Sequence, residues 1–330
     1  MIKLFHSPYS LRPLSSLNAA TPQKERKGTL LKVRWDDGLQ GYADLHPWPE
    51  LGDQPLDFHI KELQEGRITA LVEQSMWLAH RDATLRSQRK NFFDDGVPLK
   101  NNFTVTQAHK VGPNLVDEIK REGFSSVKVK VGRNFHQEVG FLNHLAASNL
   151  FIRLDFNAQG NWQTFEKYIS NLSSEVKAFI EYVEDPFPFD EREWKDACTL
   201  APIALDNEYH KVPWHRIINP PFDVMVVKPA RVDVKKAVDF CRKWDLKMTV
   251  TSSMDHPVGV AHAVSVAMEL KKDHGDMILD AGCMTHRLYQ KDLFVNELLT
   301  QGPYFTKGRG WGVGFDKILQ VLPWHMLRES

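Results

Sequence analysis

The sequence predicts an α/β fold in which a closed (β/α) barrel follows an α+β capping domain. From roughly residue 100 onward, short β-branched runs alternate with amphipathic stretches, which is typical of repeated βα units and a parallel sheet. The chain has 330 residues, enough for one barrel and an appended unit. A doubly wound sheet would begin with a glycine-rich phosphate turn, but no GxGxxG follows any expected strand.

The composition is that of a globular protein and argues against several classes of function. Hydrophobic residues make up 42% and charged residues 25%. Lysine plus arginine and aspartate plus glutamate number 42 each, so no net field attracts nucleic acid. The N-terminus MIKLFHSPYS lacks the apolar run of a secretory signal, and no later run approaches roughly 18 apolar residues. We therefore expect a cytoplasmic protein with no nucleic-acid partner and no membrane insertion.

Residues 1–100 carry the signals of the capping domain. The runs Thr29–Trp35 and Gln40–Leu45 bracket Asp36–Gly38, which predicts two strands joined by a tight turn. The segment Asp57–Arg89 has helical spacing of its apolar residues. Strands and helices in this mixed order indicate an α+β unit that is separate from the barrel.

The barrel is expected to occupy residues 101–288. Its eight expected strands are Asn102–Thr106, Ser125–Val131, Phe151–Asp155, Ala178–Glu184, Ile203–Asp206, Asp223–Lys228, Lys247–Thr251 and Met277–Ala281. Helices are expected at Gln107–Glu122, Phe135–Ala147 and Val232–Trp244, with only one or two turns over Val212–Ile218. No βα unit is left after Leu288, so residues 289–330 are expected to return to the capping domain and complete it.

The second expected barrel strand places two lysines inside the barrel. In Val127–Val131, alternation puts the valines on one face and Lys128 and Lys130 on the other. Valines that face the surrounding helices leave both lysines pointing inward, where an ammonium is costly unless it is paired or near the open end. An isolated Lys-x-Lys is more often the solvated face of an edge strand. The acids that end the following strands favour the interior position.

Three acids, Asp155, Glu184 and Asp206, end three consecutive expected strands. The C-terminal ends of barrel strands line the mouth where substrates bind, so these carboxylates are expected to converge. Repelling carboxylates need a cation, and oxygen ligands without His or Cys favour Mg²⁺, with Mn²⁺ as a possible substitute. One acid at such a position is as readily explained by helix capping, but three on consecutive strands favour a metal site.

Lys228 ends the sixth expected strand, which lies opposite the second in an eight-stranded barrel. Lys130 and Lys228 would therefore face each other across a substrate that is held on the metal ion. This arrangement suits abstraction of a proton α to a carboxylate, because the ion neutralises the enediolate and an amine takes the proton. Burial and nearby positive charge would lower the pKa of such a lysine enough for it to act as a base.

Other residues near these strand ends are candidates for supporting and substrate-binding roles. Asn157 lies two residues past Asp155 and could hydrogen-bond a carboxylate ligand. Arg153 points inward one layer down, as either a structural counter-ion or a catalytic group. The run Thr251, Ser252 and Ser253 at the end of the seventh strand offers hydroxyls and backbone donors for a small-molecule carboxylate substrate, although a plain loop would look the same.

Together these motifs resemble the enolase superfamily and, within its muconate-lactonizing branch, most closely the o-succinylbenzoate synthase family. The resemblance covers nearly the whole chain, and the order and spacing of the KxK, DxN, EDP and KP elements are specific to the superfamily. Its markers are GYADLHPWPELGD (41–53), VKVKVG (127–132), RLDFN (153–157), YVEDP (182–186), ALDNE (204–208), VVKPA (226–230), TSSMDHPVG (251–259) and LDAG (279–282).

The resemblance implies a (β/α) barrel of the enolase type and a lyase that acts as a hydro-lyase. Lys130 would be the base, Lys128 its supporting neighbour and Lys228 the second lysine. The implied Mg²⁺ ligands are Asp155, Glu184 and Asp206. The implied reaction is the dehydration of 2-succinyl-6-hydroxy-2,4-cyclohexadiene-1-carboxylate to o-succinylbenzoate, a step of menaquinone biosynthesis, through α-proton abstraction and an enediolate.

Two other functions would use the same residues differently. An N-acylamino acid racemase or a cycloisomerase would keep the two lysines and the metal site, and a barrel without catalysis would serve as a binding protein. Asp280-Ala281-Gly282 is not the Asp-x-Asp that dipeptide epimerases use, which argues against that activity. Asn207, where relatives commonly carry an acid, and Glu208 leave open which side chain supports the third ligand.

Overall fold

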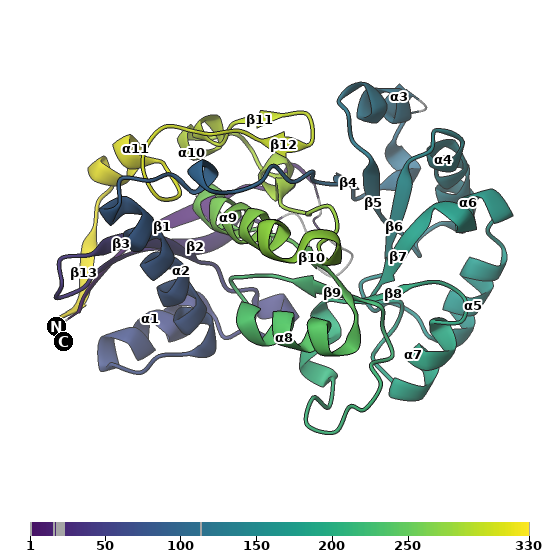
Figure 1. Ribbon diagram of the computed structural model, residues 1–330, viewed down its shortest axis with the longest axis horizontal. Helices are drawn as coiled ribbons and strands as arrows, with labels where there is room; N and C mark the ends of the chain where they lie inside the picture. Colours follow the sequence, from purple (N-terminus) through teal and green to yellow (C-terminus); the bar gives the residue numbers. More distant parts are fainter. Residues whose placement is uncertain (1, 16, 18–23, 113, 330) are drawn as a thin grey trace.

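The computed structural model describes residues 2–15, 17, 24–112 and 114–329. The capping sheet lies at one end of the molecule and the parallel sheet of the barrel at the other, with helix α9 between them (Figure 1). The start of β1 and the end of β13 lie side by side at the outer end of the capping sheet (Figure 1). The expected division into an α+β cap and a parallel α/β sheet is confirmed.

The capping sheet has four antiparallel strands in the order β13-β1-β2-β3. They are β1 (Lys3–Leu11), β2 (Arg26–Arg34), β3 (Gln40–Leu45) and β13 (His325–Glu329). The expected hairpin is present, and Gly38 takes the left-handed backbone that its turn requires. The last strand of the chain therefore pairs with the first, β13 with β1.

Two helices and two short 3-10 turns accompany this sheet: α1 (Leu56–Glu65), α2 (Ala70–Ser87), η1 (Pro49–Leu51) and η2 (Phe92–Asp94). Helix α2 packs directly on β3. A Cβ atom at Gly41 would lie 1.9 Å from the carbonyl oxygen of Ala79, so only glycine permits this close approach.

The barrel sheet has seven regular strands, all parallel, in the order β10-β9-β8-β7-β6-β5-β4. They are β4 (Phe103–Val105), β5 (Ser126–Lys130), β6 (Phe151–Asp155), β7 (Ile180–Glu184), β8 (Ile203–Leu205), β9 (Val224–Val227) and β10 (Lys247–Val250). The α-helices that accompany them are α3 (Asn114–Arg121), α4 (Phe135–Ala147), α5 (Trp162–Ser170), α6 (Ser174–Phe179), α7 (Glu191–Ala197), α8 (Val234–Trp244) and α9 (Pro257–His274).

The prediction of a regular eighth strand over Met277–Ala281 is wrong. This segment instead closes the barrel through isolated parallel bridges, with Ile278 to β10 on one side and Ala281 to Asn101 on the other. Backbone hydrogen bonds join the segment to β10 and to the residues before β4. The carbonyl of Asp280 also accepts hydrogen bonds from the side chains of Arg153 and Thr249, each at 2.8 Å. The ring of strands is closed without an eighth regular strand.

Two connections also differ from expectation. The helix expected over Gln107–Glu122 is split into a 3-10 turn, η3 (Ala108–Lys110), and α3, with Gly112, a weak helix former, between them. Between β8 and β9 the structure has the 3-10 turn η4 (Asn207–Lys211), while Val212–Ile218 forms turns and bends instead of a helix.

The rest of the chain after α9 is built from short elements. They are η5 (Gly275–Met277), η6 (Met284–Leu288), α10 (Leu293–Glu297), β11 (Thr300–Gln301), β12 (Tyr304–Phe305) and α11 (Asp316–Val321). From α10 to α11 this part of the chain runs back along the capping side of the molecule and leads into β13 (Figure 1).

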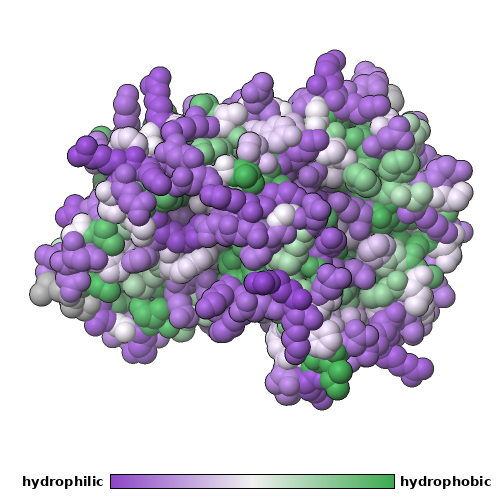
Figure 2. All heavy atoms as spheres, viewed as in Figure 1, coloured by the Kyte–Doolittle hydropathy of each residue, from purple (hydrophilic) through white to green (hydrophobic). Residues whose placement is uncertain are grey.

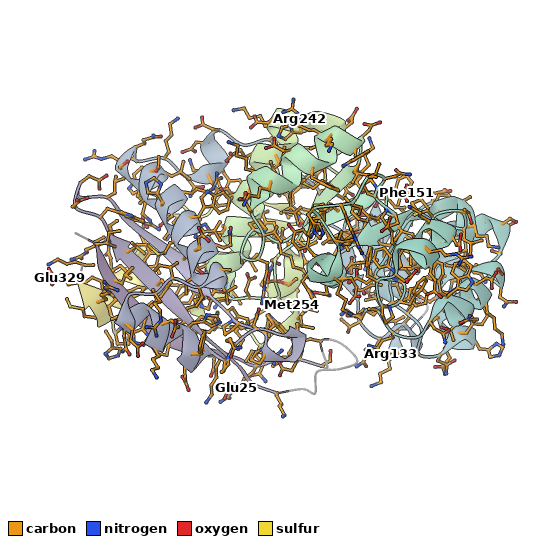
Figure 3. The ribbon with its side chains drawn as sticks, turned by 90° about the horizontal axis from the view of Figure 1, so that it is seen from below. Glu25, Arg133, Phe151, Arg242, Met254 and Glu329 are labelled. Atoms are coloured by element: carbon orange, nitrogen blue, oxygen red, sulfur yellow. The ribbon has the colours of Figure 1, made fainter. Side chains whose placement is uncertain are left out.

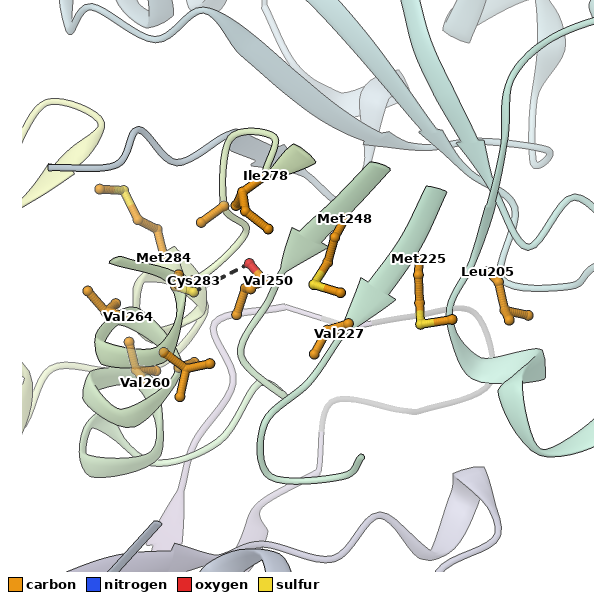
Figure 4. Close-up of a cluster of buried hydrophobic side chains, with 14 of the residues drawn as sticks. Leu205, Met225, Val227, Met248, Val250, Val260, Val264, Ile278, Cys283 and Met284 are labelled. Atoms are coloured by element: carbon orange, nitrogen blue, oxygen red, sulfur yellow. Dashed lines mark hydrogen bonds between the residues drawn. The ribbon is translucent and has the colours of Figure 1, made fainter. Parts of the chain in front are cut away.

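The hydrophobic core is continuous between the barrel strands and the helices that cover them. Val260 and Val264 from α9 lie beside the buried Cys283, and Met248 and Met225 continue the same cluster along β10 and β9 (Figure 4). The outer surface in the view of Figure 2 is mostly hydrophilic, with apolar residues scattered over it. In the part of the chain that the structure describes, no helix combines the length and the apolar character needed to cross a bilayer.

Candidate active site

The C-terminal ends of the barrel strands surround a small inner cavity of about 70 Å³ that contains the charged groups expected from the sequence. Its lining includes Lys128, Lys130, Asp155, Glu184, Asp206 and Lys228. It continues into an outer cleft of about 520 Å³, and Asp206 and Lys228 line both spaces. Met254, at the junction of cap and barrel (Figure 3), and Leu51 from the cap also line both. The expected site residues are therefore brought together where cap and barrel meet.

Strand register explains why these groups meet at one level. Lys130 pairs with Asp155 across β5 and β6, and Asp155 pairs with Glu184 across β6 and β7. In parallel strands with this register, side chains of paired residues point to the same face. Strands β6, β7 and β8, which lead to the three acids, lie between β5 and β9, so the two lysines flank the acids on opposite sides.

Lys128 lies on β5 two residues before Lys130, further from the end of the strand, and is held by two acids. Its ammonium Nζ is 2.5 Å from Glu184 Oε1 and 3.1 Å from Asp155 Oδ2. Burial alone would lower the pKa of Lys128, but these carboxylates outweigh burial and hold it well above its usual value. Lys128 is therefore a permanent cation that neutralises two neighbouring acids.

Lys130, two residues further along β5, has a different environment. Its Nζ is hydrogen-bonded to Asn157 Oδ1 at 3.1 Å and lies 3.8 Å from Asp155 Oδ2. Burial, together with the ammonium groups of Lys128 and Lys228, lowers the pKa of Lys130 despite the nearby carboxylates. A buried lysine with this shift can release its proton and act as a base more readily than an exposed lysine.

Lys228 follows β9 directly and binds the acid on the opposite side of the cavity. Its Nζ lies 2.6 Å from both carboxylate oxygens of Asp206 and 3.2 Å from Asn207 Oδ1. Lys228 is close enough to Lys130 to contribute to the shift in that residue's pKa. The two amines therefore influence the same small volume from separate strands.

The carboxylates of Asp155, Glu184 and Asp206 are suitable ligands for a divalent cation. In this structure they bind lysine ammonium groups. Across the described residues, no three His, Cys, Asp or Glu side chains are grouped as a ready metal site. Glu184 Oε2 is nevertheless buried without a hydrogen-bond partner among the described groups. Burial, together with repulsion from Asp155 and Asp206, raises the pKa of Glu184 well above its usual value. A cation at this point would satisfy an oxygen that the lysines leave unsatisfied.

Arg153 does not line the cavity. It is fully buried one layer below, where its guanidinium donates to Glu181 at 2.6 Å and to Asn102 at 3.0 Å. It also lies over the ring of Tyr182, 5.0 Å from the centroid. These contacts, together with the bond to the closing segment at Asp280, favour a structural role over a catalytic one.

The serines after β10 occupy different parts of the site. Ser252 lines the inner cavity, and its hydroxyl shares a hydrogen bond of 2.7 Å with Thr285. Ser253 lines the outer cleft, and its buried hydroxyl has no partner among the described groups. The buried hydroxyl of Thr251, which also lines the inner cavity, is likewise unpaired within that set.

The cap contributes a wall to the outer cleft through the segment His46–Asp53. Arg231, three residues after Lys228, forms an ion pair with Asp53 and donates to the carbonyl of His46 at 3.1 Å. The indole of Trp48 donates to the carbonyl of Ser253 at 2.9 Å. These contacts fix the segment that carries Leu51 against the barrel.

Comparisons with known proteins agree with this geometry. The family model described as "O-succinylbenzoate synthase, N-terminal domain" matches residues 4–85, and the one described as "Enolase C-terminal domain-like" matches residues 114–318. An o-succinylbenzoate synthase from Bdellovibrio bacteriovorus is 58% identical over 328 residues, which cover 99% of each chain. The chain belongs to the o-succinylbenzoate synthase family of the enolase superfamily.

Solved structures share the fold of this o-succinylbenzoate synthase family member at low identity. An L-Ala-D/L-Glu epimerase from Bacillus subtilis, solved with a substrate ligand, matches with a TM-score of 0.76 and 14% identity, covering 94% of this chain and 97% of that one. A dipeptide epimerase from Enterococcus faecalis, complexed with Mg and a dipeptide, matches with a TM-score of 0.73 and 14% identity, covering 94% and 98%. The racemase, cycloisomerase and binding-protein alternatives are not favoured, because the full-length relative is a synthase.

In this o-succinylbenzoate synthase family member, the structure assigns contacts to the two residues that the sequence left open. Asn207 accepts a hydrogen bond from Lys228, and Glu208 accepts one from the backbone of Phe189 at 2.6 Å. The sequence reasoning also missed Asp185, which is fully buried and accepts backbone hydrogen bonds from the residues that follow β8. Its place in the EDP motif was visible in the sequence, but its bonding partners were not.

Proposed function

We propose that the protein catalyses the dehydration of 2-succinyl-6-hydroxy-2,4-cyclohexadiene-1-carboxylate to o-succinylbenzoate, as a lyase of menaquinone biosynthesis. The observation that carries this proposal is the convergence of two lysines and three acids on one cavity. It is supported by a relative of the same activity that is 58% identical over nearly the full length. A cytoplasmic location and a small-molecule carboxylate substrate are part of the proposal.

Asp155, Glu184 and Asp206 would hold Mg²⁺, with Mn²⁺ as a possible substitute, because the site offers carboxylate oxygens and no His or Cys. The bound ion would stabilise the negative charge that develops on the substrate carboxylate when its α-proton leaves. Lys128, which is 2.5 Å from Glu184 and 3.1 Å from Asp155, would fix the position of both acids.

Lys130 would take the α-proton and then, as an ammonium, return a proton to the departing hydroxyl group. The hydrogen bond from Lys130 to Asn157 orients its Nζ, and burial favours its neutral form before the reaction. Lys228 would stay protonated on the other side of the substrate, where its positive charge opposes the developing negative charge. Loss of water gives an aromatic ring, so the protein mainly has to start an elimination that then runs downhill.

The remaining polar groups would hold the rest of the substrate. Ser252 and Ser253 would donate their hydroxyls to a substrate carboxylate, and the unpaired hydroxyl of Thr251 would donate to an oxygen in the inner cavity. Leu51 and Met254, which line both the cavity and the cleft, offer apolar contact for the substrate's carbon skeleton.

The direct test is to incubate the purified protein with Mg²⁺ and the cyclohexadiene acid and to follow o-succinylbenzoate by chromatography. We expect catalytic turnover that EDTA abolishes and added Mg²⁺ restores. An authentic o-succinylbenzoate synthase assayed in parallel controls for substrate quality. Absence of product in the test sample, with product in the control, would refute the proposal.

A further inference from the structure

Asp185 joins three strand ends at the mouth of the barrel. It follows the last residue of β7, and its side chain is fully buried. Its backbone N–H donates to Ala204 on β8 at 3.0 Å, and its carbonyl accepts from Ala158, after β6, at 2.8 Å. The backbone of Asp185 therefore forms hydrogen bonds on both sides of β7, with β8 and with the residues that follow β6.

The side chain of Asp185 holds the residues that follow β8. Its Oδ1 accepts from the backbone N–H of Asp206 at 2.9 Å, and its Oδ2 accepts from that of Asn207 at 2.7 Å. Asp206 and Asn207 each accept a hydrogen bond from Lys228. One buried carboxylate thus sets the position of the third acid, Asp206, and of the neighbouring Asn207.

The backbone is strained at Asp185 and at two residues after β6. The surrounding contacts must hold it in this conformation. Asn157, Ala158 and Asp185 all have positive φ, at 52°, 54° and 41°. Residues with a Cβ avoid this region, and such conformations persist where surrounding contacts impose them, often at functional sites. The bond between Ala158 and Asp185 links two of these residues directly.

Helix capping does not explain why a buried acid occupies position 185. Helix α7 begins at Glu191, and its N-cap is Asp190, whose side chain accepts from Arg192 and Glu193. Both oxygens of Asp185 are used instead by the end of a neighbouring strand. Its contacts are directed toward the cavity residues and away from the helix that follows in sequence.

We propose that Asp185 is a positioning residue that fixes Asp206 for metal binding and for its contact with Lys228. The inference rests on the proposed function, because it assigns Asp206 to the metal site. Outer groups that orient metal ligands typically change metal affinity or activity by about 10–100-fold when they are replaced. Asp185→Asn keeps one acceptor and places an amide group against the other backbone N–H, so we expect an effect of this size.

The experiment compares wild type, Asp185→Asn and Asp82→Asn. Asp82 is the control, because it is equally buried, accepts backbone N–H groups from Tyr42 and Val313 on its two oxygens and does not line the cavity, although it also pairs with Arg86. Mg²⁺ affinity is measured by isothermal titration calorimetry, thermal unfolding by calorimetry without metal, and kcat and KM with the cyclohexadiene acid. We expect Mg²⁺ affinity and kcat to fall about 10–100-fold in Asp185→Asn and to stay near wild type in Asp82→Asn.

Asp185 would be only a structural residue if both variants lost stability alike while Asp185→Asn kept wild-type Mg²⁺ affinity and kcat, and this result would overturn the proposal. Should Asp185→Asn fail to fold, Asp185→Glu decides, since it keeps a carboxylate but displaces it: weakened Mg²⁺ binding supports the proposal, and unchanged binding overturns it. A failure of the proposed function is seen separately, as absence of Mg²⁺ binding or product in the wild type.

Discussion

Two regions of the molecule bury acidic side chains, and the acids in the two regions have different partners. At the barrel mouth (Asp155, Glu184 and Asp206), every acid lies within 3.1 Å of a lysine Nζ. At the cap–barrel junction (Asp44 and Asp255), the acids form no ion pair within the described part of the chain. Asp44 instead accepts from the hydroxyl of Tyr9 at 2.5 Å and the backbone N–H of His256 at 2.9 Å.

The partners of Asp155 and those of the junction acids shift their pKa values in opposite directions. Burial would raise the pKa of Asp155, but Lys128 and Lys130 outweigh it and hold that pKa below its usual value. At the junction, burial and mutual repulsion raise the pKa of Asp44 well above its usual value, and burial raises that of Asp255 to about 6. Asp155 at the mouth therefore keeps its charge, whereas the two junction acids are closer to their neutral form, as is Glu184, whose pKa is also raised.

Replacing the base at the mouth should have the largest effect on activity. Lys130→Ala removes the group that transfers the proton, so we expect kcat to fall by about 10²–10⁴-fold. Steady-state kinetics with the cyclohexadiene acid measure the change. Lys236→Ala, at a side chain that is 82% exposed on α8, is the control and should retain full activity. A Lys130→Ala variant within a few-fold of wild type would show that another group is the base.

Replacing an acid at the mouth should weaken the metal site. Glu184→Gln keeps the shape of the side chain but removes its charge, so the Mg²⁺ concentration for half-maximal activity should rise by more than the roughly 10–100-fold typical of replacing a group outside the ligand set. Mg²⁺ should also raise the unfolding temperature of the wild type more than that of the variant, because it binds only the folded state. Equal shifts for the two proteins would place the ion elsewhere.

Replacing an acid at the junction should change the pH dependence of stability and leave kcat nearly unchanged. Between the ordinary pKa of 3.8 and the raised value of about 6, folded Asp255 keeps its proton while the unfolded chain has lost it. Wild-type stability should therefore fall as pH rises through this window, with the loss complete above about pH 6.

Asp255→Asn removes this proton-linked loss. The free energy of unfolding of the variant, relative to wild type, should then increase by roughly 3 kcal/mol between about pH 4 and pH 7. Urea unfolding at intervals across this range measures the difference. Parallel curves for the two proteins would contradict the raised pKa.

The smallest expected effect comes from the hydroxyl that joins the junction groups. Tyr9→Phe removes the hydrogen bond to Asp44 and the contact with His46 Nδ1 at 2.8 Å. Leaving these buried groups with fewer partners should cost about 1–3 kcal/mol in the free energy of unfolding. Denaturant unfolding checks this cost, and kcat should stay within about two-fold of wild type. A large fall in kcat would tie the junction to catalysis.

The sequence was sufficient where the signal is local. Alternation in Val127–Val131 predicts the inward lysines, and the acid that ends each strand can be recognised without knowing which strands are neighbours. The closing segment near Asp280 could not be foreseen, since its irregular bonding depends on Arg153 and Thr249 from other strands. Each proposed lysine and acid could be recognised from the sequence of its own strand.

Contacts between distant parts of the chain explain what the sequence could not predict. Asp44 and His256 are 212 residues apart in the chain yet share a buried hydrogen bond. Asp185 stands in a recognisable motif, but its side chain bonds to backbone groups that carry no sequence signal. The choice of Lys128 and Lys228 as the counter-ions of the acids likewise depends on side-chain geometry across several strands.

The most direct test of this mouth chemistry is a crystal structure of the protein with Mg²⁺ and o-succinylbenzoate. We expect one ion bound by Asp155, Glu184 and Asp206, with the product between Lys130 and Lys228. An ion bound away from these acids, or a product with both lysines on the same side of its ring, would contradict the proposed arrangement.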